Sequence, residues 1–158
     1  MVSWASDTIA APSGPLVSPE MFREFALPVY ERVIEVLDRY GVLLKILSTT
    51  GGDLSSLLPS FFDAGINGLW ISNIMSSHME YAALRREYGS EIALIGGIDS
   101  TALTADDDTL RRVIEETVPP LLETGHYLPC LDDRPRQNVP FARYRLYRNI
   151  LSEIAHPA

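Results

Sequence analysis

Apolar residues along this chain follow two different patterns. Short, nearly continuous apolar runs occupy residues 42–47, 68–71, 92–95 and 127–131, as is typical of strands that are buried on both faces. Between these runs, apolar residues recur every three or four positions, which is the spacing of a helix that covers a core. The pattern predicts about four strand–helix units in succession.

The first helix has a clear start and a clear end. Ser18 is expected to be its N-cap, Pro19 suits the first helical position, and Glu20 favours the positive end of the helix. Pro28 is expected to kink the helix or to divide it in two, and Gly41 is expected to end it. Apolar residues recur along it at helical spacing: Phe22, Phe25, Val29, Val33, Val36, Leu37 and Tyr40.

The later helices are also predicted from capping residues. Asp53 is expected to cap the second helix, and Ser76 or Ser77 a third helix over residues 78–88. A capping box beginning at Thr104 predicts the start of the fourth. The last helix, over residues 139–154, has a predicted inner stripe of Phe141, Tyr144, Tyr147, Ile150 and Leu151.

The spacing of these elements predicts the class of fold. The strands begin roughly 25 to 35 residues apart, the span of one strand, a crossover helix and the return. This rhythm is typical of a parallel α/β sheet, and four units make half of a TIM-type (β/α)8 barrel. We expect residues 1–13 to be a loose segment and residues 14–158 to form a single domain. Dimerisation or a partner chain would cover the strand edges of a half-barrel, and an open, flavodoxin-like sheet is the alternative.

Composition and charge narrow the possible partners. The formal net charge of -8 would repel a phosphate backbone, so we expect no nucleic acid partner. No segment approaches the roughly 18 apolar residues that cross a bilayer, and residues 1–14 do not resemble a leader sequence. We therefore expect a cytoplasmic protein without a membrane partner. The lone Cys130 suits a reducing compartment, and we interpret it as a small buried hydrophobe.

Small polar residues and glycines follow two of the predicted strands. Because the loops after parallel strands gather at one edge of the sheet, these residues are candidate ligand contacts. Ser48, Thr50 and Gly51 belong to a turn whose backbone amides suit an anion, and a tight strand-to-helix connection is the alternative interpretation. Gly96 and Gly97 permit close approach of the backbone to a small molecule.

Three carboxylates at the same predicted edge are candidate catalytic residues. Asp99 can act as a general base or orient a ligand, or it can instead cap the turn that follows it. Asp132 and Asp133 can divide acid and base roles or accept a hard cation. The alternative is that one of them pairs with Arg134 or Arg136 at the surface.

The histidines do not suggest a metal site. Three histidines and one cysteine cannot form a zinc site of ordinary spacing, and we expect no metal and no cofactor. His126 precedes its predicted strand, which places it at the edge opposite to that of a barrel's active site.

Several short motifs follow one another in a distinctive order along the chain. They are residues 13–25 with Leu27 and Pro28, residues 84–89, residues 95–99, residues 127–129 with Asp132, and residues 139–141 before Tyr144. In this order they resemble the uroporphyrinogen decarboxylase superfamily over nearly the whole chain from about residue 7, and the resemblance is closest to the superfamily's cobalamin-related methyltransferases.

The resemblance implies a barrel enzyme, and the chain departs from it at particular positions. The methyltransferases carry a His-x-Cys zinc pair where this chain has Ser48 and Thr50, and hydroxyl groups are poor zinc ligands. Their acidic residue after the next strand is replaced near Asn73 or Ile74, and the position of the histidine that follows their fourth-strand aspartate is occupied by Asp133. The decarboxylases bind substrate through an arginine-rich N-terminal half, and Asp7 corresponds to an aspartate just before the shared region.

Three hypotheses follow for the function. The first is half of a decarboxylase-type lyase or corrinoid-linked methyltransferase, completed by a second copy or by a partner chain, with a tetrapyrrole or a methyl donor as ligand. The second is a ligand-binding or regulatory module that has lost catalysis. The third is a truncated product without independent activity, although capped and well-patterned helices argue against random decay.

Overall fold

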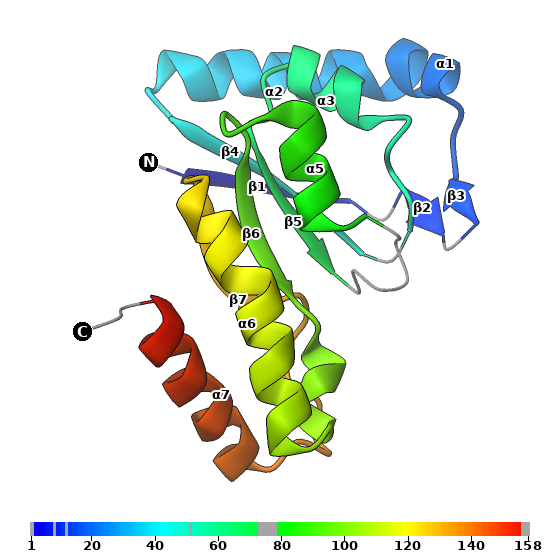
Figure 1. The fold of residues 1–158 in the computed structure, drawn as a ribbon. Helices are drawn as coiled ribbons and strands as arrows, with labels where there is room; N and C mark the ends of the chain where they lie inside the picture. The colour runs from blue at the N-terminus through cyan, green and yellow to red at the C-terminus, as the bar shows by residue number, and fades with distance from the viewer. Residues whose placement is uncertain (1, 8, 12, 51, 73–78, 156–158) are drawn as a thin grey trace.

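The computed structural model describes residues 2–7, 9–11, 13–50, 52–72 and 79–155. Five parallel strands form one sheet in the order β1-β4-β5-β6-β7, and a two-stranded hairpin lies beside it (Figure 1). The sheet strands are β1 (Val2–Asp7), β4 (Leu44–Thr50), β5 (Gly68–Ser72), β6 (Ala93–Ile98) and β7 (Tyr127–Leu131), and the hairpin strands are β2 (Ala10–Ala11) and β3 (Gly14–Pro15).

The helices that the structure describes between the strands all cover the same face of this sheet. They are α1 (Pro19–Met21), the π-helical turn η1 (Phe22–Ala26), α2 (Leu27–Arg39), α3 (Leu58–Asp63), α5 (Tyr81–Tyr88), the 3-10 helix η2 (Ser100–Thr104) and α6 (Asp107–Glu123), with α7 (Phe141–Ala155) packed beside α6. Leu47, Leu69 and Leu94 lie in register across three strands and belong to the core cluster that contains the helix residues Ile34 and Phe61.

This one-sided packing decides between the two expected architectures. A doubly wound sheet reverses its strand order at one point and carries helices on both faces. Here the strand order follows the chain without a reversal, so each helix returns over the same face. The fold is therefore a partial α/β barrel of the TIM type, as the strand spacing predicts, and the flavodoxin-like alternative is wrong.

The sheet has one strand more than the sequence pattern predicts. Strand β1 lies inside the segment 1–13 that we expected to be loose, and it pairs with β4 from Val2 opposite Leu44 to Asp7 opposite Thr49. The polar residues of β1 interrupt the apolar run by which the other strands are recognised in the sequence. The backbone of β1 is instead held in place by its pairing with β4. Strands β4 and β6 also continue to Thr50 and Ile98, so Ser48, Gly96 and Gly97 lie in strands rather than in the turns after them.

The first helix starts as predicted and contains an unusual turn. The side chain of Ser18 accepts a hydrogen bond from the backbone N–H of Met21 at 3.2 Å, and Pro19 is the first helical residue. Pro28 lies at the start of α2, directly after the π-helical turn of η1. Because proline has no N–H to donate, the wider turn accommodates it without breaking the helix.

Other helix starts differ from the predicted ones. Asp53 accepts hydrogen bonds from the backbone and side chain of Ser55, and α3 begins only at Leu58. The N-cap of α6 is Asp106, which accepts from the backbone of Thr109, rather than Thr104. Helix α5 begins at Tyr81. The predicted caps Ser76 and Ser77, with His78, lie outside the described residues.

The two ends of the sheet rest on separate apolar clusters. One joins α2, α3 and α5 to β4, β5 and β6, and the other joins η2, α6 and α7 to β6 and β7. The predicted inner stripe of the last helix is confirmed for four members, which are Tyr144, Tyr147, Ile150 and Leu151. It is wrong for Phe141, the first residue of α7, which is 75% exposed.

Candidate functional site

The turns that carry two of the predicted carboxylates, Asp99 and Asp132, are joined by hydrogen bonds at the C-terminal edge of the sheet. The backbone N–H of Ser100 donates a hydrogen bond to Oδ1 of Asp132 at 2.8 Å, and the N–H of Asp132 donates to the carbonyl oxygen of Ile98 at 2.8 Å. The side chain of Asp132 is almost fully buried. The turns that follow β6 and β7 therefore form one acidic unit at the rim of the partial barrel.

Asp99 also caps the short helix that follows it. Its Oδ1 accepts a hydrogen bond from the N–H of Thr101 at 2.8 Å, and its Oδ2 accepts from the hydroxyl of Thr101 at 2.7 Å. Asp99 therefore has the capping role that we expected as the alternative to a catalytic role. The carboxylate keeps this position because η2 begins immediately after it.

Asp133 makes the surface ion pair that we expected for one of the adjacent carboxylates. Its Oδ2 pairs with the guanidinium of Arg136, and its Oδ1 accepts from the backbone N–H of Arg134. The Asp133 side chain is 19% exposed and that of Arg136 is 61% exposed. The pair holds the loop between β7 and α7 close to the rim.

The glycines of β6 make room for aromatic side chains of the protein. Both have positive φ angles, +104° at Gly96 and +82° at Gly97. A Cβ on Gly97 would lie 2.8 Å from the ring of Tyr81, and one on Gly96 would lie 3.0 Å from the ring of Trp70. In this structure the space beside the two glycines is therefore taken by Tyr81 and Trp70, and contact of the glycines with a small molecule stays a prediction.

Two tyrosine hydroxyls hold the backbone of β6 at this point. The pairing between β5 and β6 ends at Trp70 and Ile95. Beyond it, the hydroxyl of Tyr81 accepts from the N–H of Ile71 at 3.0 Å and donates to the carbonyl oxygen of Ile95 at 2.5 Å. The hydroxyl of Tyr127 donates to the carbonyl oxygen of Gly96 at 2.8 Å. Burial raises the pKa of both tyrosines well above its usual value.

Cys130 lies near the same tyrosines, on β7. Burial raises the pKa of its thiol to about 11, and the negative charge of Asp132 adds to the shift. The thiol therefore stays protonated at neutral pH, when a thiolate is the form that acts as a nucleophile or metal ligand. These features fit the predicted role of a small, mostly buried hydrophobe.

The predicted anion turn lies on the other side of the sheet's centre. Ser48 is buried on β4 and stands in register with Trp70 of β5, which separates it from the glycines of β6. Thr50 ends β4, but its side chain lies outside the described residues, as does Gly51. A Cβ on the next residue, Gly52, would lie 2.5 Å from the carbonyl oxygen of Ala11. This glycine therefore packs the turn against β2.

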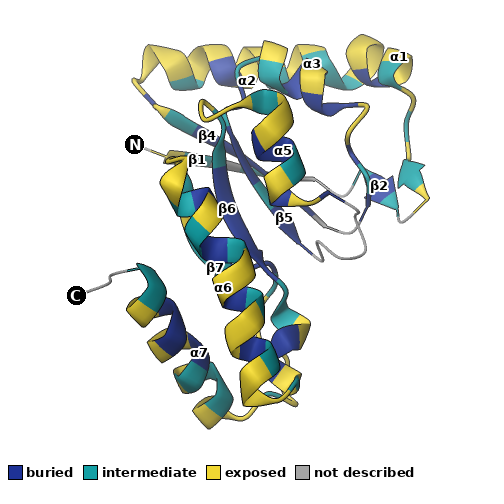
Figure 2. Cartoon of the chain, viewed as in Figure 1, coloured by how far each residue is buried: buried dark blue, intermediate teal, exposed yellow. Residues whose placement is uncertain are grey.

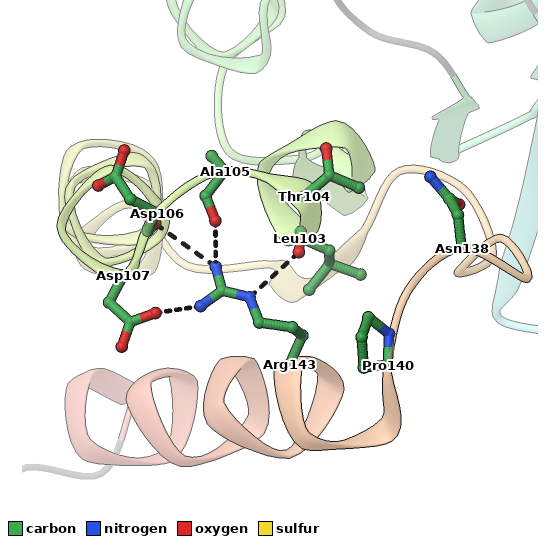
Figure 3. Close-up of a pocket in the computed structure, with 8 residues that line it drawn as sticks. All are labelled: Leu103, Thr104, Ala105, Asp106, Asp107, Asn138, Pro140 and Arg143. Carbon is green, nitrogen blue, oxygen red and sulfur yellow. Dashed lines mark hydrogen bonds and ion pairs between the residues drawn. The ribbon is translucent and has the colours of Figure 1, made fainter.

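An arginine that sequence reasoning did not single out anchors the rim from α7. The guanidinium of Arg143 donates to the carbonyl oxygens of Leu103 at 3.2 Å and Ala105 at 2.6 Å, and it pairs with Asp107 (Figure 3). It borders a cavity of about 590 Å³ between η2, α6 and the start of α7. The sequence around Arg143 does not indicate this role, because its hydrogen-bond acceptors are backbone carbonyl oxygens far away along the chain.

The described side chains do not fit the zinc site of the methyltransferase branch. The residue in place of one ligand, Ser48, is a buried hydroxyl, which is a weaker zinc donor than imidazole or thiolate. Across residues 2–72 and 79–155, apart from the few undescribed positions, no three His, Cys, Asp or Glu side chains gather closely enough to hold a metal ion. His126 lies before β7, at the opposite edge of the sheet, as predicted.

Together, the one-sided parallel sheet and the acidic rim define a partial TIM-type barrel with its candidate site at the C-terminal ends of the strands. The family model described as Uroporphyrinogen decarboxylase (URO-D) matches residues 6–128. The match covers most of the 158 residues, and the chain belongs to this family, as its motif order predicts. The comparison with curated proteins gave no match. None of the described helices is long and apolar enough to span a bilayer.

Proposed function

We propose that this chain is half of a decarboxylase-like catalytic barrel and that a second half-barrel, a further copy or a companion chain, completes its small-molecule site. The observation that carries this proposal is the open face of the sheet. Ser48, Trp70, Ile95 and Leu128 lie in register on the face opposite to the helices. In a closed barrel such residues fill the interior in layers.

The exposed fractions of these residues support an incomplete interior. Leu128 on the edge strand β7 is 60% exposed, although its neighbour Ile95 on β6 is only 8% exposed. A groove of about 550 Å³ runs over Leu44, Ala93, Ile95 and Leu128. Strands β1 and β7 form the two ends of the sheet, and closing a barrel would pair both edges.

The charge of the rim also supports a second half. A porphyrinogen of this family's substrate class carries several carboxylates, and Asp99, Asp132 and Asp133 stand at the rim of this chain. Like charges repel at short range. Arg136 and Arg143 near the rim are already paired with Asp133 and Asp107. Cationic groups that bind such a substrate would therefore come from the second half-barrel.

In the completed site, we assign acid and base roles to the carboxylates. Asp99 would act as a general base or orient the ligand, and Asp132 and Asp133 would divide proton donation and acceptance. The ligand contacts would be Ser48, Thr50 and Gly51 on one side and Gly96 and Gly97 on the other. Decarboxylation is the preferred chemistry, and corrinoid-linked methyl transfer is the alternative.

A second function is favoured by the hydrogen bonds of the same carboxylates. Both oxygens of Asp99 already accept from Thr101, and those of Asp133 accept from Arg134 and Arg136. A substrate proton could reach these oxygens only by displacing one of the hydrogen bonds that they already accept. This arrangement supports a ligand-binding or regulatory module that keeps the fold and has lost turnover.

Two measurements separate these functions. Anaerobic release of CO₂ from uroporphyrinogen, by the chain with any companion half-barrel present, would support the decarboxylase, and Asp99→Asn should then abolish turnover without unfolding the protein. Binding of the stable oxidised probe uroporphyrin without CO₂ release would support the binding module. Demethylation of methylcobalamin would point to the methyltransferase alternative. Absence of binding and of both reactions in every assembly would contradict the proposal.

A further inference from the structure

Helix α2 presents a second apolar stripe that the sheet does not cover. The side of α2 against the sheet and α3 carries Tyr30 and Ile34, and Tyr30 packs edge-on against Phe61 of α3 with ring centroids 5.0 Å apart. We call the exposed set the α2 stripe. Its members and their exposed fractions are Phe25 67%, Val29 50%, Val33 53%, Val36 47% and Tyr40 73%.

The α2 stripe is continuous and points away from the core. At about 100° per residue, Val29, Val33, Val36 and Tyr40 lie within a sector of roughly 60°, centred some 130° from the buried Ile34. Figure 2 shows exposed positions along the whole outward side of this helix. From the exposed fractions, the five side chains present on the order of 500 Å² of largely apolar surface, as large as the biggest patch of a typical monomer.

We propose that the α2 stripe is the docking surface for a second copy of this chain, with the two α2 helices antiparallel about a two-fold axis near Val33. The spacing of the stripe supports this partner, because it is nearly the same in both directions along the helix. Antiparallel pairing places Phe25 beside Tyr40 of the partner subunit and Val29 beside Val36 of the partner subunit. The axis then passes close to Val33 of both copies, as a self-complementary interface requires.

The charges beside the stripe match the same arrangement. Glu24, Arg32, Glu35 and Arg39 lie along one flank of the helix, and all four are exposed. With the axis near residue 33, Glu24 lies opposite Arg39 of the partner subunit and Arg32 lies opposite Glu35 of the partner subunit. Unlike charges therefore face each other at four places across the interface, where they extend the ion pair that Glu35 and Arg39 make with each other within one chain at 3.2 Å. Such pairs set register and orientation more than affinity.

The size and charge of the stripe favour a second copy over a membrane surface. A standard interface buries roughly 800 Å² on each partner, and the apolar stripe with its charged flank approaches this area. Helices that bind membranes carry an excess of lysine and arginine on the polar face. Here the flank holds two acidic and two basic residues, and the whole chain has a net charge of -8.

Sedimentation of the full chain carrying Leu128→Glu, which blocks association through the open face of the sheet, tests this proposal over a wide concentration range. Val33→Glu should weaken self-association by about 100-fold or more, since it places two carboxylates at an apolar axis. Phe141→Glu, on the exposed start of α7, is the matched control and should leave the assembly unchanged. Arg39→Glu should weaken the dimer about tenfold, and the double variant Glu24→Arg with Arg39→Glu should restore most of the affinity.

Disulfide trapping tests the antiparallel register and does not depend on the stability of a charged variant. In a Cys130→Ala background, Val33→Cys should form a linked dimer on mild oxidation. Phe25→Cys and Tyr40→Cys should link when mixed, and neither should link alone. Phe141→Cys should stay unlinked.

Three results would overturn the proposal. In the Leu128→Glu background, they are a chain that stays monomeric at all concentrations, an assembly that Val33→Glu leaves intact, and a monomer that floats with phosphatidylcholine–phosphatidylserine vesicles. The outcome is separable from that of the proposed function, because Leu128→Glu on the open face should block barrel completion and leave the α2 dimer unchanged.

Discussion

The N–H of Ser100 donates to Oδ1 of Asp132 at 2.8 Å and so joins the turns after two neighbouring strands. Together with the bond from the N–H of Asp132 to the carbonyl oxygen of Ile98, it fixes the relative position of Asp99, one residue before the donor, and Asp132. Because Asp132 is buried, water cannot replace it as an acceptor without a change in packing. The position of Asp132 at the acidic rim is therefore determined by the packing and hydrogen bonds of the fold.

Removing this acceptor should destabilise the protein. We expect Asp132→Ala to lower the free energy of unfolding by about 2–3 kcal/mol, because the Ser100 N–H loses a charged acceptor in a buried site. Asp132→Asn keeps an acceptor oxygen and should lose less than half as much. Urea unfolding followed by circular dichroism measures both variants, and equal effects would contradict a hydrogen-bonding role.

The bridge between β5 and β6 gives a second prediction. Tyr81→Phe removes one hydroxyl that serves both Ile71 and Ile95, and we expect a loss of about 1–3 kcal/mol from two unsatisfied backbone groups. Tyr30→Phe, which removes a buried hydroxyl that has no hydrogen-bond partner among the described residues, is the control and should change stability by less than about 0.5 kcal/mol. A similar loss for both variants would show that the bridge does not stabilise the sheet.

Gly97 provides a test of the close packing on β6. Gly97→Ala places a methyl group 2.8 Å from the ring of Tyr81, whereas Gly125→Ala, also at positive φ, meets open space. Both variants carry the backbone strain of a non-glycine residue at positive φ. We therefore expect Gly97→Ala to cost about 1–3 kcal/mol more than Gly125→Ala in chemical denaturation. Equal costs would mean that the strand moves away from Tyr81 freely.

Stability should fall on the alkaline side of neutrality. Burial raises the pKa of Cys130 from 9.0 to about 11 and that of Tyr147 from 10.0 to about 12. The folded state therefore holds these protons more tightly than the unfolded state, and the resulting stability is complete below pH 9 and lost between pH 9 and 12. Denaturation midpoints measured from pH 8 to 11 should decline, and less steeply between pH 9 and 11 for Cys130→Ala. A midpoint that rises over this range would contradict the assignment.

The sequence predicts the parallel barrel units well because burial of a parallel sheet leaves a clear pattern. Strand β7 has the predicted bounds, and the other three predicted strands overlap β4, β5 and β6. Strand β1 escaped prediction because its residues are half polar and its stability comes from pairing with β4 rather than from its own composition. The α2 stripe could not be distinguished from the buried side of the same helix for a similar reason. Helical spacing identifies apolar positions on a helix, but it does not show which of them contact the sheet.

The candidate site was predictable only in part. Glycine and aspartate at strand ends identified Gly96, Gly97, Asp99 and Asp132. Other residues at this edge were not predictable. Tyr81, which packs against Gly97, comes from helix α5, and Arg143 binds carbonyl oxygens some 40 residues away. Contacts of this kind depend on the three-dimensional arrangement and leave no local pattern in the sequence.

Hydrogen exchange at the two edges of the sheet tests the half-barrel directly. In the assembly that binds ligand, amides of β1 and β7 should exchange as slowly as those of the central β5, because a second half-barrel pairs with both edges. In Leu128→Glu the same edge amides should exchange much faster while β5 stays protected. Fast exchange at both edges in every assembly, with ligand bound, would contradict the account.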